Sequence, residues 1–280
     1  MIKDILVCLE GSPSSDAATR AAIEIARERH AGLVGMAIVD EPDIRAGTPA
    51  SIGGSSFKHW RDETLLADAR THAKDWLGTF ERRCREEGMR VRVIETVGRP
   101  AEAIIGEMRH HDLTVMGRDA NFRFETASED TSTRDKILRH APHPVLLIPD
   151  SEAAASLGRK VLIAYDGGEP AEHALASFMR SGLAESREIH VATVGDDGEK
   201  AWEIANGAGE KLRTFGIKAF THSIVSLLPT SEALVKLGSD LGVGLFVMGA
   251  FAHSRLAELI HGSGTRNIME HSTAALCLQH

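Results

Sequence analysis

Short apolar runs alternate with amphipathic stretches along the whole chain. The runs of the first half are 5–9, 33–39, 91–94, 113–116 and 145–148. Mostly apolar runs of this length are typical of strands that are buried on both faces. Between them, Ala, Leu and Ile recur at helical spacing, and Ser or Pro stands near the expected helix starts. This alternation predicts a parallel sheet covered by helices on both faces.

The second half repeats the same order with runs at 161–165, 189–194, 218–225, 245–248 and 274–278. The phrase Val-Met-Gly ends the fourth run of each half, at Gly117 and at Gly249. The first half is longer because residues 41–56 are rich in Pro, Gly, Ser and Thr, which predicts a loop before a long helix over about 62–87.

The repeat predicts an α/β fold of two tandem doubly wound domains, 1–150 and 158–280, joined by a linker. Each domain is expected to hold a five-stranded parallel sheet in the order 3-2-1-4-5, with helices on both faces.

Composition narrows the class of protein. The 280 residues are 42% hydrophobic and 26% charged, with a net charge of −8, which disfavours binding to nucleic acid because such binding needs a basic face. There is no run of eighteen apolar residues and no secretory leader, so we expect a cytoplasmic protein that does not bind a membrane. Cys8 and Cys277 stand in apolar runs and are expected to be small buried side chains.

Candidate chemistry gathers where strands end in the second half. Ligands of doubly wound sheets bind beyond the carboxyl ends of the strands, where the strand order reverses. The residues expected there follow the strands or begin the next helix, and together they predict an adenine nucleotide site: Asp166, Gly167, Val194, Met248, Gly249, Ala252, Gly262, Ser263 and Gly264. The Gly-Ser-Gly segment offers backbone N–H groups to phosphates at a helix N-terminus.

The segment Val247-Met248-Gly249-x2-Ala252-x9-Gly262-Ser263 resembles the nucleotide motif G-x2-G-x9-G-(S/T) of the universal stress proteins. The likeness extends over the whole chain and is to the tandem type, in which two such domains are fused. It implies a regulatory protein that binds ATP, with or without Mg²⁺, and no committed enzymatic activity. It further implies that Asp166 contacts the adenosine, that Gly249 lies against the nucleotide and that Gly262 and Ser263 hold phosphates.

The resemblance also implies how the repeats associate. The fifth strands, near 145–148 and 274–278, are expected to pair as in a dimer, and a further homodimer and an unidentified protein partner are expected. Ala252 stands where the family has its second glycine, and its methyl group is expected to weaken the site.

The first half departs further from the motif. Glu10 replaces the first-strand Asp, and Glu129 and Asp130 stand near the expected Gly-Ser pair. A backbone donor to a charged phosphate contributes roughly 1.5–3 kcal/mol. A carboxylate about 5 Å away costs about 3 kcal/mol at an effective dielectric of about 20. Because two carboxylates would largely cancel such contacts, we expect no ATP phosphates in the first half.

Other interpretations fit parts of the pattern. Asp166 equally fits a helix cap, Met248 a core side chain, and Gly262 to Gly264 a plain helix start. An ATP-hydrolysing or nucleotidyl-transferring enzyme would need an acid near the γ-phosphate, and Glu258 is the nearest in sequence. A scaffold without nucleotide is expected if Ala252 closes the site. No His-Glu-x-x-His or similar spacing predicts a metal site.

Overall fold

The computed structural model describes residues 1–46, 55–122, 133–151, 156–249, 268 and 272–279. The first half runs through β1 (Asp4–Leu9), α1 (Pro13–Arg29), β2 (Gly32–Val39), α2 (Glu41–Ala46), α3 (Ser55–Glu86), β3 (Val91–Val97), α4 (Pro100–Met108), β4 (Leu113–Gly117), α5 (Thr133–His140) and β5 (Val145–Ile148). The second half runs through β6 (Lys160–Ala164), α6 (Glu169–Ser181), β7 (Glu188–Gly195), α7 (Gly198–Thr214), β8 (Ala219–Val225), α8 (Thr230–Leu241), β9 (Leu245–Gly249) and β10 (Ala275–Gln279).

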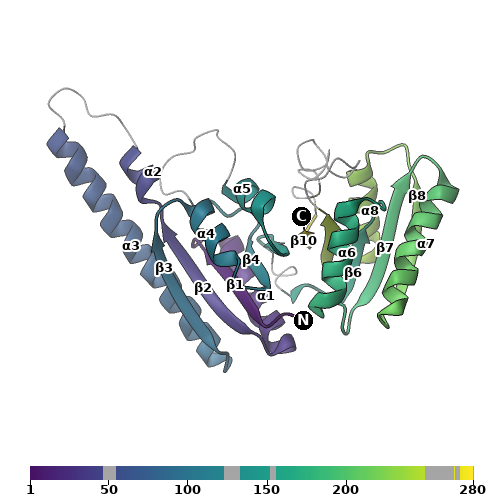
Figure 1. Cartoon of the computed structure of the whole chain (residues 1–280). Helices are drawn as coiled ribbons and strands as arrows, with labels where there is room; N and C mark the ends of the chain where they lie inside the picture. The colour runs from purple at the N-terminus through teal and green to yellow at the C-terminus, as the bar shows by residue number, and fades with distance from the viewer. Residues whose placement is uncertain (47–54, 123–132, 152–155, 250–267, 269–271, 280) are drawn as a thin grey trace.

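The strands of these ranges form one ten-stranded sheet in the order β3-β2-β1-β4-β5-β10-β9-β6-β7-β8. Each half therefore has the order 3-2-1-4-5 and is parallel within itself. The halves meet where β5 pairs antiparallel with β10, with Leu146 opposite Cys277. Figure 1 shows the two halves side by side, the first in purple to teal and the second in green to yellow. The predicted α/β fold and the predicted pairing of the fifth strands are confirmed.

Helices cover both faces of the sheet and enclose two apolar clusters (Figure 1). One cluster lies under α1, α3, α6 and α7, where the fully buried side chains include Ile25, Leu175 and Leu212. The other lies under α4, α5 and α8. Cys8 and Cys277 are buried in these clusters, and burial raises the pKa of each thiol to about 12, so both are inert apolar side chains as predicted.

The predicted loop over 41–56 is wrong at both of its described ends. Residues Glu41–Ala46 form the helix α2, and α3 begins at Ser55 rather than near Asp62. Asp40 explains the start of α2 because its carboxylate accepts a hydrogen bond of 3.1 Å from the Asp43 N–H. Ile44 is fully buried, so tertiary packing stabilises a helix that is too short to persist alone.

Ion pairs join the two halves beside the strand pairing. The Arg29 guanidinium lies 2.7 Å from Glu185, and the Arg187 guanidinium lies 3.0 Å from Glu28. Both arginine side chains are nearly buried, at 7% and 4% exposed. The end of α1 therefore forms ion pairs with the segment between α6 and β7, in which the arginine charges are nearly buried and the carboxylates are more exposed.

Candidate functional site

A cavity of about 630 Å³ opens at the carboxyl ends of β6 and β7. Its walls come from the segments after these two strands and from α7 and α8, namely residues 164–168 and 192–197 with Lys200, Ala201, Ile204, Thr230 and Leu234. This volume is typical of sites for small organic ligands. The cavity lies at the carboxyl ends of parallel strands, as ligand sites of doubly wound folds do. It lies to one side of the predicted place, because the strand order reverses between β6 and β9 and no residue of β9 lines the cavity.

Asp166 and Gly167, two of the predicted site residues, line this cavity. The Asp166 carboxylate accepts a hydrogen bond of 2.9 Å from the Gly168 N–H and so shapes the turn into α6. Gly167 has a φ of +78°, a conformation that favours glycine. The helix-cap interpretation of Asp166 is wrong, because Gly168 is the N-cap of α6 and no side chain caps that helix. Asp166 instead shapes the preceding turn, and an oxygen atom used by one N–H leaves acceptor capacity on the carboxylate.

The end of β7 and the start of α7 bring Val194 and several polar groups to the cavity. Asp196, Asp197 and Lys200 line the cavity, and Asp197 caps α7 by accepting from the Glu199 and Lys200 N–H groups at 3.0 and 3.2 Å. Carboxylates accept hydrogen bonds and repel anions. The described part of this cavity is thus suited to the hydroxyl and amino groups of a neutral ligand portion.

Met248 and Gly249 occupy different surroundings from those predicted. Met248 is fully buried in the cluster under α8 and does not line the cavity, which agrees with the core interpretation. Gly249 packs against the start of α6, because a Cβ added there would lie 2.5 Å from the carbonyl carbon of Pro170. Gly117 repeats this arrangement, with a virtual Cβ 3.0 Å from the Ser15 nitrogen. The repeated glycine therefore has a packing reason that requires no ligand.

Four predicted site residues, Ala252, Gly262, Ser263 and Gly264, lie outside the described residues, as does Glu258. The same holds for Glu129 and Asp130 in the first half. The described site is accordingly the portion formed by β6, β7, α7 and α8.

The corresponding place in the first half is filled by a tryptophan. Gly11 has a φ of +79°, like Gly167, but a Cβ added to it would lie 2.6 Å from the Trp76 ring atom Cζ2. A Cβ added to Gly167 would meet only Ile204, at 3.5 Å. Buried residues recur at the same spacing in both helices: Ala73, Leu77, Phe80 and Cys84 in α3, and Ala201, Ala205, Ala208 and Leu212 in α7. This match places Trp76 and Ile204 at corresponding positions.

Glu10 differs from Asp166 in its hydrogen-bond partner and its burial. Its carboxylate accepts a hydrogen bond from the Ser12 hydroxyl, and Ser12 itself caps α1. Burial raises the pKa of Glu10, against the Ser12 hydrogen bond, which lowers it. The two halves therefore differ both in the acidic residue and in the space above the turn.

Sequence reasoning missed the helix residues of the cavity. Ile204, Thr230 and Leu234 come from α7 and α8. Behind them, the Tyr165 hydroxyl donates to Glu172 and accepts from the Lys211 ammonium at 3.3 Å, which ties α6 to α7. Burial first, and then Glu172, raises the pKa of Tyr165 to about 12, so it stays a neutral hydrogen-bonding group.

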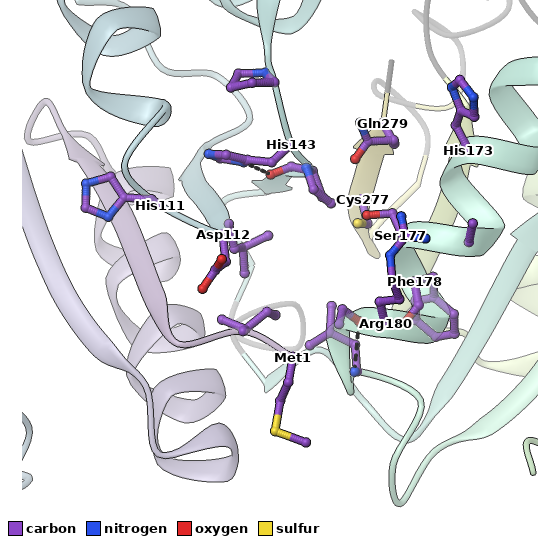
Figure 2. Close-up of a pocket in the computed structure, with 17 residues that line it drawn as sticks. Met1, His111, Asp112, His143, His173, Ser177, Phe178, Arg180, Cys277 and Gln279 are labelled. Carbon is purple, nitrogen blue, oxygen red and sulfur yellow. Dashed lines mark hydrogen bonds between the residues drawn. The ribbon is translucent and has the colours of Figure 1, made fainter. Parts of the chain in front are cut away.

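A second cavity of about 550 Å³ lies between the two halves (Figure 2). Ser177 and Arg180 of α6 face His143 and Asp112 of the first half across it. The His143 ring nitrogens contact the Pro144 and Met108 carbonyl oxygens at 3.0 and 2.8 Å, and burial lowers its pKa. This cavity lies at the amino ends of β1, β4 and β5 and beside the carboxyl end of the antiparallel β10, away from the carboxyl ends of β6 and β9 where the strand order of the second half reverses.

The described ranges contain neither a cluster of metal-ligating side chains nor a helix suited to span a membrane. No group of three or more His, Cys, Asp or Glu side chains in those ranges is arranged to hold a metal ion. None of the described helices combines the length and apolar character needed to cross a bilayer.

Comparison with known proteins gave concordant results. The family model described as "Universal stress protein family" matches residues 1–149. A universal stress protein of Synechocystis sp. is 25% identical over 281 residues, covering 96% of each chain. Among solved structures, a universal stress protein from Archaeoglobus fulgidus has a TM-score of 0.70 at 19% identity, covering 98% of this chain and 95% of that one.

A putative universal stress protein from Pseudomonas aeruginosa has a TM-score of 0.58 at 14% identity, covering 99% and 92% of the two chains. Because the sequence identities to these two solved structures are only 19% and 14%, the structural similarity shows a shared fold alone.

Proposed function

The chain belongs to the universal stress protein family, and on that premise we propose that it is a regulatory protein of the stress response that binds ATP in its second repeat. The proposal rests mainly on the cavity of about 630 Å³ at the carboxyl ends of β6 and β7. Asp166, Gly167 and Val194, nominated from the sequence alone, all line it.

The carboxylates that line the cavity support an adenosine moiety in its described part. Asp166, Asp196 and Asp197 can accept hydrogen bonds from ribose hydroxyls or from the adenine amino group. These three carboxylates outnumber the single ammonium group of Lys200, so the net charge there disfavours a phosphate. We propose that the phosphates extend towards Gly262, Ser263 and Gly264, with or without Mg²⁺. Nucleotide occupancy would then change the choice of partner.

Isothermal titration calorimetry with ATP on the full chain tests this function. We expect one site per chain in the wild type and at least tenfold weaker binding in Asp166→Ala. Asp166→Asn keeps an acceptor for the Gly168 N–H, so a partial loss in that variant separates ligand contact from the shape of the turn.

Glu10→Ala is the matched variant in the first half, and we expect it to bind ATP as the wild type does. Equal affinities of wild type and Asp166→Ala, or a loss confined to Glu10→Ala, would contradict the proposal. No heat of binding in any of the proteins would favour a scaffold without nucleotide.

We further propose a homodimer in the cytoplasm. One chain has a mass of 30.2 kDa, so sedimentation equilibrium distinguishes a monomer from a dimer directly. The pairing of β5 with β10 already uses the fifth strands within one chain, and a homodimer would therefore use another surface.

A further inference from the structure

Two imidazole rings and a carboxylate form a chain of hydrogen bonds on the two outer strands of the second half. His190 Nδ1 of β7 lies 2.9 Å from His222 Nε2 of β8, and His190 Nε2 lies 2.8 Å from Glu188 Oε1. The His190 residue is only 4% exposed. Figure 1 shows β7 and β8 at the outer end of the second half, where β8 is the edge strand of the sheet.

The first half carries an apolar pair at the corresponding positions. His190 is opposite Leu162 of β6, as Val34 is opposite Leu6 of β1. His222 is opposite Ala192 of β7, as Ile94 is opposite Met36 of β2. The first half therefore has Val34 and Ile94 where the second half has His190 and His222. Burying polar rings instead is costly unless their hydrogen bonds are satisfied.

The partners determine where protons can sit. Glu188 is a carboxylate and only accepts, so His190 Nε2 carries a hydrogen atom. In the neutral state His190 Nδ1 is then an acceptor, and His222 Nε2 must be the donor. The ring centres lie 5.2 Å apart and the two nitrogens 2.9 Å, so the nitrogens lie near the line between the centres, as a direct N–H···N bond requires.

The first and second added protons have different consequences. The first can bind at His222 Nδ1 and leaves the bond from His222 Nε2 to His190 Nδ1 intact. A second would have to bind at His190 Nδ1, which would place two N–H groups against each other. The hydrogen bond between His190 and His222 would then be lost, and two imidazolium cations would lie in contact.

Charged and aromatic groups surround the three residues. Lys160 of β6 lies 3.6 Å from Glu188, and the Phe220 ring of β8 stacks on His190 with ring centres 5.2 Å apart. Helix α8, which packs on this face, carries Glu232, Lys236 and Asp240. Burial and then His190 lower the pKa of His222 below its ordinary value of 6.5, and the hydrogen bond from His190 lowers the pKa of Glu188.

We propose that Glu188, His190 and His222 form a proton-binding site that accepts one proton without change and loosens the edge strand β8 when a second proton binds. The second repeat would then respond to acid at an edge where the first repeat does not. A His222 pKa lowered in the fold means that the site contributes less stability as pH falls below 6.5. The lowered pKa of Glu188 acts in the same direction at lower pH.

Nuclear magnetic resonance on the full chain tests the proposal between pH 8 and pH 4.5. The ring nitrogen shifts of the histidines follow the protonation of each ring, and hydrogen exchange gives the protection factors of the β8 amides. The β3 amides serve as the internal control. We expect protection of β8 to fall at least tenfold more than that of β3 as the second proton binds.

The double variant His190→Val/His222→Ile carries the residues of the first half and should remove the difference between β8 and β3. His222→Gln is a second variant, because its amide can still donate to His190 Nδ1 but cannot take up a proton; it should also remove the difference. Protection of β8 that follows β3 in the wild type while both rings become fully protonated would overturn the proposal. So would a loss of protection at β8 that persists in either variant.

Discussion

Gly117 and Gly249 show how a single residue places the first helix of each repeat. Each ends a buried strand, and the backbone at the start of α1 or α6 lies where its Cβ would be. We predict that Gly249→Ala lowers the free energy of unfolding by about 1–3 kcal/mol, because the methyl group overlaps Pro170. Urea denaturation of the variant measures this loss.

Gly207→Ala is the control for that substitution. Gly207 lies in α7 with nothing within 4 Å of an added Cβ, so alanine should stabilise the helix by about 0.5–1 kcal/mol. A Gly249→Ala protein as stable as the wild type would show that α6 can move away from β9 at little cost.

Single residues also mark how far the sequence could predict the site. Asp166, Gly167 and Val194 follow strands directly, and the carboxyl ends of parallel strands meet at one edge, so their place was predictable. Trp76 and Ile204 come from helices far along the chain, and which side chain reaches the turn is decided by packing. Met248 was ambiguous because a methionine fits a core and a ligand site equally well.

At the scale of elements, α3 packs on β2 where the Phe80 ring of the helix lies against Gly35 of the strand. A Cβ on Gly35 would lie 2.5 Å from the Phe80 ring, whereas the corresponding pair in the second half is Val191 and Ala208. We predict that Phe80→Ala costs about 3–5 kcal/mol, as for other truncations of a buried phenylalanine. Adding Gly35→Val to it should recover part of this loss.

A double-mutant cycle in urea measures the recovery. Gly35→Val alone should destabilise the fold because of the overlap with Phe80, so the two changes should show a favourable coupling of more than about 1 kcal/mol. Additive effects would mean that the two residues do not share the same space.

The same helices decide whether a repeat has room for a ligand. On the proposed function, Ile204→Trp should weaken ATP binding at least tenfold, because a ring at this position would fill the space that Trp76 fills in the first half. The reciprocal Trp76→Ile should leave the affinity unchanged. Calorimetry on both variants checks this pair, and an unaffected Ile204→Trp would show that the nucleotide does not use this cavity.

Elements themselves were predictable where one signal dominated. The run 145–148 matches β5 because a continuous apolar stretch has few alternatives in a doubly covered sheet. Helix α2 was missed because its composition is that of a loop, and its stability comes from the cap at Asp40 and the burial of Ile44. Such contacts are set by tertiary structure and leave little trace in local sequence.

At the scale of the whole molecule, two buried arginines hold the halves together. We predict that Glu28→Gln costs about 2 kcal/mol, because Arg187 would keep a nearly buried charge with a weaker partner. This predicted loss of stability is smaller than the loss on breaking a fully buried ion pair, because the Glu28 side chain is 31% exposed. Urea denaturation is again the measurement.

Glu87→Gln provides the control for this charge change. Glu87 and Arg27 lie 3.8 Å apart and both are more than half exposed, so their pair should contribute no more than about 0.5 kcal/mol. Equal losses in the two variants would show that the contact between the halves does not depend on the buried arginines.

The asymmetry of the two repeats is the central claim, and a crystal structure of the full chain grown with ATP tests it most directly. We predict a nucleotide at the carboxyl ends of β6 and β7 beside Asp166, with none above Gly11, where Trp76 occupies the space. A nucleotide bound in the first half, alone or together with one in the second, would contradict the account.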